Sequence, residues 1–316
     1  MRCPGLAWTA ILLATSTLSG CGWVGALRAD REIQTAHTHY NWGRHALAAE
    51  SYEEVIRLDP ERGEAYFFLG SSYHRLFRER ARTPDTERYL TLAARHYRAA
   101  IERLDDEEQV IQAWRYLAEI HGPEGLDDRG EEEAALTAVV ALTPDDPQPG
   151  FSLVEFQVRA GHGEAATREL ERLSALDAAD GHVHSRIAGL YDQLGRFDES
   201  IDALRRRAAL MEDSAEARYV IAAFYWRQVS ENIELTDAER ADHLRQGLAA
   251  LDEALELDAD YADALTYKEI QLSRLAELVD DPSERRALLE QAKEAGEQAA
   301  TLNASRDESP AAPGAR

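Results

Sequence analysis

The sequence predicts an all-α protein, built as a solenoid of stacked helical hairpins. The main evidence is a segment from Gly150 to Asp213 that repeats itself at an offset of 34 positions, so that Gly161 returns as Gly195. Within each copy, apolar and small residues recur at three- and four-residue spacing, which is typical of one buried stripe on a helix. The two glycines fall between such stripes, where a tight turn is needed. A repeat of this length indicates stacked hairpins rather than a closed globule.

Beyond this pair of copies, the chain resembles the tetratricopeptide repeat (TPR) family. The clearest motif is the Ala-Tyr-Phe-Phe-Leu-Gly-Ser-Ser-Tyr sequence of residues 65–73, which directly follows Leu-Asp-Pro at 58–60. It is similar to the family's proline, aromatic, Leu-Gly and Tyr series. Small residues let paired helices approach closely, and proline cannot continue the preceding helix. Similar registers cover roughly residues 31 to 303, and the resemblance implies an all-α, right-handed superhelical solenoid of about seven helical hairpins.

The first three repeats can be placed by their key residues. The first runs from about Arg31 to Pro60. The second starts at Gly63 and carries an insert over residues 77–91, in which Thr83 and Pro84 are typical of a helix start. The third has its two stripes separated by a Gly- and Pro-containing loop at 121–125.

The later repeats follow the same scheme. The fourth and fifth are the regular pair. The sixth contains an insert with a capping-box pattern from Thr236 to Glu239, and the seventh has a helix start near Asp281. The second, sixth and seventh hairpins are therefore expected to be elongated. We expect residues 304–316 to form a disordered tail, because they are rich in Ser, Pro, Gly and Ala.

Composition excludes several classes of ligand and structure. The chain has 316 residues and a formal net charge of −24, which argues against a nucleic-acid backbone as the main ligand. A solubilising surface is one interpretation of this acidity, and recruitment of a basic partner is the other. The only two cysteines, Cys3 and Cys21, lie near the N-terminus and cannot build a disulfide framework or a zinc cluster.

The N-terminus has the features of an export signal. Arg2 precedes an apolar run from Leu6 to Leu18, which is too short to span a bilayer as a stable helix. The following Ser-Gly-Cys resembles a bacterial lipoprotein signal, which implies removal of residues 1–20 and lipidation of Cys21. Gly22 in place of Asp points to the outer membrane by that family's sorting rule. Residues 21–30 are then a short tether, followed by the array at 31–303. Ordinary secretion and an uncleaved anchor are the alternatives.

No catalytic constellation or cofactor site is predicted. His37 and His39 are two positions apart, as are His182 and His184, so each pair falls on different faces of a helix. The acidic run at 105–108 lacks the spacing of a calcium loop and is more typical of a solvated helix start. We therefore expect no enzyme activity, no metal and no cofactor.

The resemblance also implies where a partner would bind. In TPR proteins the first helices of successive repeats line a groove for peptides or partner helices, and the register carries the following residues to that groove: Tyr40, Asn41, Phe67, His74, Arg75, Arg115, Phe151, Arg159, Tyr219, Trp226, Arg227 and Arg274. Four of them, at positions 75, 159, 227 and 274, form a line of arginines suited to carboxylates or carbonyl groups. The alternative is that the arginines pair with neighbouring acids and the aromatic residues only pack between repeats. The chain does not reproduce the Lys and Asn pattern of the carboxylate clamp.

Taken together, these features predict a protein-binding scaffold or assembly factor, anchored through Cys21 and facing the periplasm. The partner is a protein or peptide, contact with the membrane is through the lipid, and nucleic acid is not expected. An accessory or substrate-recruiting subunit of a cell-wall or export enzyme complex is the alternative.

Overall fold

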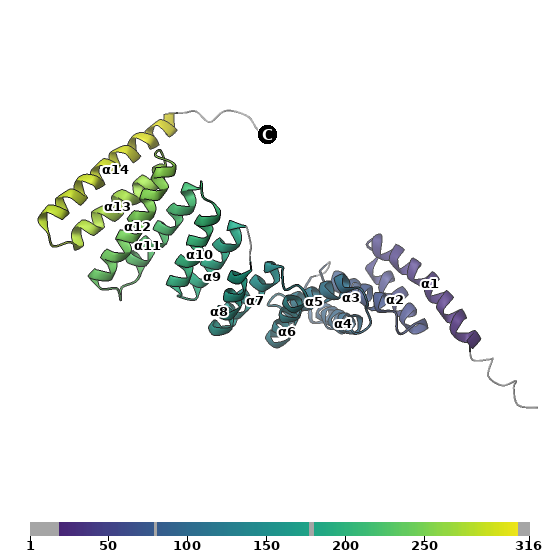
Figure 1. Cartoon of the computed structure of the whole chain (residues 1–316). Helices are drawn as coiled ribbons and strands as arrows, with labels where there is room; N and C mark the ends of the chain where they lie inside the picture. Colours follow the sequence, from purple (N-terminus) through teal and green to yellow (C-terminus); the bar gives the residue numbers. More distant parts are fainter. Residues whose placement is uncertain (1–18, 79–80, 177–179, 309–316) are drawn as a thin grey trace, which may run out of the picture. The chain divides into compact units, whose positions relative to one another are not determined.

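The computed structural model describes residues 19–78, 81–176 and 180–308, and these ranges contain fourteen α-helices and no strand (Figure 1). The helices are α1 (Ser19–Asn41), α2 (His45–Leu58), α3 (Gly63–Arg78), α4 (Pro84–Ile101), α5 (Glu107–His121), α6 (Arg129–Leu142), α7 (Pro147–Ala160), α8 (Gly163–Ala175), α9 (Gly181–Gln193), α10 (Phe197–Leu210), α11 (Ala215–Glu231), α12 (Asp237–Leu257), α13 (Ala262–Leu278) and α14 (Pro282–Glu308). The predicted fold class, an all-α array of about seven hairpins, is confirmed.

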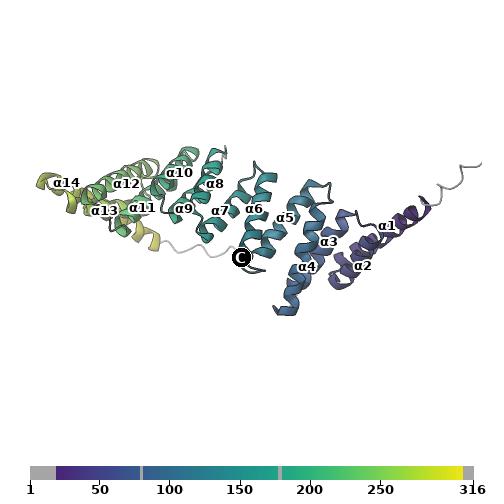
Figure 2. The same cartoon turned by 90° about the horizontal axis from the view of Figure 1, so that it is seen from below.

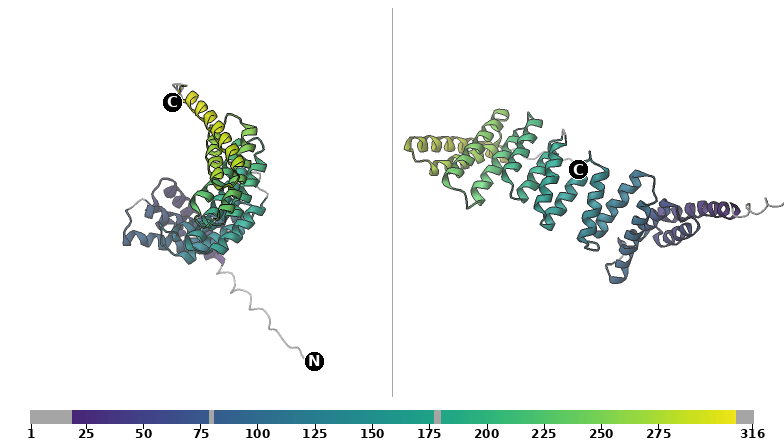
Figure 3. Two further views of the ribbon diagram at one scale, coloured as in Figure 1. Left: turned by 90° about the vertical axis from the view of Figure 1, so that its left-hand side faces the viewer. Right: turned by 60° about the horizontal axis from the view of Figure 1, so that its bottom comes forward.

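The chain divides into two compact units, residues 1–156 and 157–316, with the division inside α7. The first unit contains the hairpins α1–α2, α3–α4 and α5–α6, and the second contains α9–α10, α11–α12 and α13–α14. Figure 1 shows α11 to α14 side by side, and Figure 2 shows α3 beside α4. Figure 3 gives two further views of the same hairpins.

Apolar residues at helical spacing build the core of the first hairpin. On α1, Ala29, Ile33 and Ala36 are buried at intervals of four and three residues, and they belong to one cluster with Tyr52 and Val55 of α2. This spacing keeps the three side chains on one face of α1. None of the described helices has the length and apolar composition that a membrane crossing requires.

Glycine is required at the regular turns. Gly161 and Gly195, the pair from the sequence repeat, have φ values of 77° and 70°, and Gly43 has 70° in the α1–α2 turn. These values lie in the left-handed region, which a Cβ atom disfavours. The prediction that Gly161 and Gly195 mark tight turns is confirmed.

The three hairpins predicted to be long are long. Helices α11 and α12 have 17 and 21 residues, and α13 and α14 have 17 and 27, against 13 and 14 in α9 and α10. In the second hairpin, α3 and α4 have 16 and 18 residues. The predicted helix starts are also present: Thr236 and Glu239 form a capping box at α12, and the Thr83 side chain accepts from the backbone N–H of Thr86 at α4.

Two predicted segments differ from the structure. Residues 21–30, expected to form a tether, are helical as part of α1, and Cys21 is the third residue of that helix. Residues 304–308, expected to belong to a disordered tail, continue α14. The apolar run up to residue 18 and the last eight residues, 309–316, lie outside the described residues.

Candidate partner-binding site

The predicted binding residues lie mainly on the first helices of the hairpins, which form what we call the inner face of each unit. In the first unit these helices are α1, α3 and α5, and in the second they are α9, α11 and α13. The second helices of the hairpins form the outer face. The two inner faces are described separately.

A hydrogen bond and a His–Glu contact join α1 to α3 on the inner face of the first unit. The hydroxyl groups of Tyr40 and Ser71 lie 2.7 Å apart, and His37 Nε2 lies 3.2 Å from Glu64 Oε1. Nδ1 of the same His37 is 2.8 Å from the hydroxyl group of a tyrosine on α2. Tyr40, a predicted binding residue, is half-buried and already bonded to its neighbour, while Asn41 is exposed at the end of α1.

His74 is a buried side chain, although the register assigned it to the groove. It is 6% exposed, and its ring meets the edge of Tyr116 at a centroid distance of 5.7 Å. Burial lowers the pKa of His74, and only Glu119, whose Oε1 lies 3.9 Å from Nε2, acts in the opposite direction. Glu119 in turn pairs with Arg78 at 3.2 Å. His74 is therefore a neutral packing residue between α3 and α5.

Two predicted aromatic anchors are also core residues. Phe67 is 8% exposed and contacts the rings of Tyr97 and Tyr116 at 5.8 and 6.3 Å. Phe151 of α7 is fully buried. The expectation that these rings line an open groove is corrected, because the surrounding structure covers them. For these two residues the packing alternative describes the structure.

The two predicted arginines of the first unit remain at the surface. Arg75 is exposed on α3. Arg115 of α5 is also exposed, and its guanidinium lies 3.8 Å from the carboxylate of Asp146. An ion pair this exposed contributes little to stability, so Arg115 can exchange its partner at low cost.

The inner face of the second unit carries half-buried aromatic rings. Tyr219 of α11 contacts both Tyr261 and Tyr267, at centroid distances of 5.3 and 5.1 Å, and burial raises its pKa. Trp226 is half-buried about two turns further along α11. Tyr261 and Tyr267 were missed from sequence because neither falls on the groove register of the TPR resemblance.

The arginines of the second unit are largely engaged within the protein. Arg227 pairs with Asp192 of α9 and lies over the Phe224 ring, 4.4 Å from its centroid. Arg274 pairs with a glutamate one turn further along α13. Arg159 is exposed on α7. The predicted line of arginines thus includes ion-paired members, as the alternative stated, and its role in partner binding stays a prediction.

Arginines on the outer face were not predicted. In the first unit, Arg98 of α4 pairs with Glu131 of α6 at 2.7 Å and contacts His121 Nε2 at 3.1 Å. In the second unit, Arg206 of α10 donates to the Ser174 carbonyl of α8 at 2.9 Å. These side chains connect second helices that are separated in sequence by a whole first helix. Sequence spacing gives no sign of such contacts, because each depends on how two repeats stack.

The acidic and histidine side chains are the natural candidates for a metal-binding group. Among the described residues, no group of three or more His, Cys, Asp or Glu side chains is placed to hold a metal ion. The acidic run at 105–108 is a helix start, as expected, since the Asp106 side chain accepts from the backbone N–H groups of Glu108 and Gln109.

Comparison with known proteins identifies the repeat type in one segment. Residues 34–62, which include the end of α1, all of α2 and the following turn, match the family described as tetratricopeptide repeat. The Leu-Gly-containing motif at 65–73 lies just beyond this match. No curated protein matches the chain.

Solved structures resemble the chain at low sequence identity. A TPR repeat-containing protein from Cytophaga hutchinsonii is 11% identical, with a TM-score of 0.47, over 85% of this chain and 98% of that one. The MamA protein is 14% identical, with a TM-score of 0.41, over 66% of this chain and 100% of that one. YrrB, described as a TPR protein with an unusual peptide-binding site, is 14% identical, with a TM-score of 0.39, over 59% and 88%.

Proposed function

We propose that this chain is a protein-interaction scaffold of the bacterial cell envelope, which binds a partner peptide or helix on the inner faces of its hairpin units. The observation that carries the proposal is the group of half-buried aromatic and basic side chains on α11. Tyr219 and Trp226 each expose part of their surface, and Arg227 follows Trp226 with its side chain 38% exposed. Tyr, Trp and Arg are the residues that contribute most to binding energy at protein interfaces.

The inner face also suits binding without a large rearrangement. Contacts between first helices hold Tyr40 and Arg227 in place in the free protein: Tyr40 bonds to Ser71, and Arg227 pairs with α9. A preorganised surface loses less conformational entropy on binding. Exposed Arg75 and Arg115 add positive charge to the inner face of an otherwise acidic protein. Carboxylates or backbone carbonyl groups of a partner are suitable acceptors for them.

The membrane attachment is the second half of the proposal. Its support is the Leu-Ser-Gly-Cys sequence at 18–21, which resembles the lipoprotein processing site. With α1 beginning at Ser19, a lipid on Cys21 would be followed at once by helix, and Ala29 of that helix is already packed in the core. The array would then be held close to the bilayer. The outer membrane, with the chain facing the periplasm, is the proposed location.

Site-specific photo-crosslinking tests the binding face. A benzophenone amino acid at Trp226 should capture a partner that the same group at Ile233 does not capture, although Ile233 is 89% exposed in the α11–α12 turn. Replacing Arg159 and Arg227 by Ala should weaken the capture and lower the free energy of unfolding by no more than about 1 kcal/mol, because the Arg227 ion pair is partly exposed. Equal capture from both positions, or a large loss of stability, would support the packing alternative.

For the anchor, Cys21→Ser should move the protein from the membrane to the soluble fraction.

A further inference from the structure

A long groove follows the outer face of the second unit, between α12 and α14 and above α13. The residues that line it recur at helical spacing, for example Leu265, Leu272 and Leu275 on α13, and Gln291, Gln298 and Leu302 on α14. Such spacing places each set on one face of its helix. The lining of α14 begins at Glu284, and from there to Leu302 it covers about 27 Å at the rise of an α-helix.

The groove contains two hollows, and the first has an apolar floor beneath paired charges. This hollow of about 320 Å³ lies at the start of α14 and is floored by leucines of all three helices, including Leu248 of α12. Lys268 bonds to Asp252 at 2.6 Å on its rim. Arg245 of α12 and Glu284 of α14 lie 3.7 Å apart across it, and both side chains are about half exposed. The charges here are balanced.

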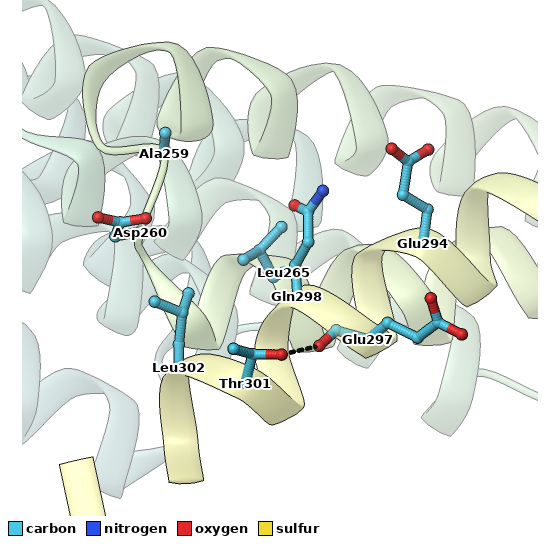
Figure 4. A pocket seen from close by; sticks show the side chains of 8 residues that line it. All are labelled: Ala259, Asp260, Leu265, Glu294, Glu297, Gln298, Thr301 and Leu302. Atoms are coloured by element: carbon cyan, nitrogen blue, oxygen red, sulfur yellow. Dashed lines mark hydrogen bonds between the residues drawn. The ribbon is translucent and has the colours of Figure 1, made fainter. Parts of the chain in front are cut away.

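The second hollow, of about 420 Å³, has acidic side chains around an apolar floor. Figure 4 shows Leu265 and Leu302 in its middle, with Asp260 on one side and Glu294 and Glu297 on the other. All the ionisable side chains that line it are acidic. A lysine one turn before Glu297 pairs with it at 3.8 Å, so the three carboxylates around this hollow still outnumber that one positive charge.

We propose that this outer groove binds a basic amphipathic helix of a partner protein. Leucine-sized side chains of that helix would cover the apolar floor, and Lys or Arg side chains at one of its ends would meet Asp260, Glu294 and Glu297. The groove has the length of several helical turns, and its apolar floor ends among these three carboxylates, which outnumber the one lysine paired with them. A helix lying in a groove with apolar anchors and charge complementarity is a common way in which proteins bind peptides.

The groove is separate from the inner face. Its lining comes from α12, α14, the turn before α13 and one stripe of α13, whereas Tyr219, Trp226 and Arg227 belong to α11. The inference therefore does not depend on the function proposed above, and either binding face can fail a test without the other.

The probe for the test is a fluorescently labelled helical peptide of leucine and lysine, and its leucine–glutamate counterpart serves as the peptide control. Full-length protein should bind the basic peptide, measured by fluorescence anisotropy, and should not bind the acidic one. In the double variant Glu294→Lys, Glu297→Lys, affinity for the basic peptide should fall by about tenfold or more, since two attractions become repulsions. Both side chains are exposed on α14, so the variant should fold normally.

A second double variant, Glu212→Lys with Glu234→Lys, changes the net charge by the same amount at exposed turn positions and should bind the basic peptide almost as well as the original chain. A photoreactive peptide should crosslink to α12 and α14. Equal loss of affinity in both double variants would overturn the proposal, because binding would then follow net charge alone. Crosslinks to Tyr219 or Trp226 would also overturn the proposal. So would a dimer of the chain that dissociates when Glu294 and Glu297 are changed to Lys, because a second copy would then occupy the groove.

Discussion

Gly195 and Gly189 lie six residues apart in one hairpin, but only Gly195 has a backbone conformation that requires glycine. Gly195 has a φ of 70°, whereas Gly189 lies inside α9 with open space at the position that a Cβ atom would occupy. Gly195→Ala should lower the free energy of unfolding by about 1 kcal/mol, because Ala is strained at this φ. Gly189→Ala should raise it by about 0.5–1 kcal/mol through helix propensity.

Denaturant unfolding of the two single variants measures these changes, and each variant serves as the control for the other. The turn conformation of Gly195 could be predicted from sequence, because the 34-residue repeat makes this glycine equivalent to Gly161. If both alanine variants were stabilising, the left-handed turn would not be a constraint on the hairpin.

His96 gives the first unit a pH dependence. Burial, and next the neighbouring Arg95, lower the pKa of His96 to about 4 from its usual 6.5. Arg95 Nη2 lies 3.3 Å from His96 Nε2, and the His96 ring stacks on Tyr73 at 5.8 Å. Between pH 6.5 and 4 the unfolded chain binds the proton more readily than the folded one, so the folded state loses stability as the pH falls.

For His96 alone the loss between about pH 7 and about pH 5 is about 2 kcal/mol. The His96→Gln variant should lack this part of the pH dependence, and urea unfolding at the two pH values measures it. His182→Gln, at an exposed position of α9, should behave like the original chain. An unchanged pH dependence in the His96 variant would show that the imidazole is not held neutral by its surroundings.

At the scale of the helix, the N-terminal segment shows how packing places a boundary. The repeat pattern starts at Arg31 and leaves 21–30 as a tether. The structure extends α1 to Ser19. At the end of the expected tether the cause is packing, because Ala29 continues the buried stripe of α1 and the Asp30 carboxylate pairs with Arg62 at 2.7 Å. The glycines near the start of α1 reduce helix propensity but do not end a helix that packs on its neighbour.

The elongated hairpins were predicted more successfully, because their evidence is local. Thr83 with Pro84, and Thr236 with Glu239, are cap patterns whose partners lie within three residues. The surface that the elongated hairpins form could not be predicted from such local patterns. The outer groove between α12 and α14 depends on the stacking of two long hairpins, and its lining residues are far apart in sequence.

At the scale of the whole chain, the repeat pattern predicted the all-α hairpin architecture and the helices on which the candidate residues lie. It did not predict which side chains the next repeat would cover. Phe67, His74 and Phe151 lie on the expected helices and are nevertheless buried, whereas Arg75, which follows His74 on α3, stays exposed. Burial at these positions depends on the size of neighbouring side chains such as Tyr97 and on the approach of successive hairpins, which periodicity alone does not contain.

The net charge of −24 makes a further prediction for the whole chain. Its repulsion acts over long distances, whereas exposed pairs such as Arg98–Glu131 each contribute only about 0–1 kcal/mol. Raising the salt concentration from about 0.02 M to about 0.2 M shortens the screening length from about 20 Å to about 7 Å, which weakens the repulsion more than the contact pairs. The midpoint of thermal unfolding should therefore rise by a few degrees. A fall in the midpoint would mean that the surface ion pairs, and not the excess of carboxylates, dominate the electrostatic free energy of folding.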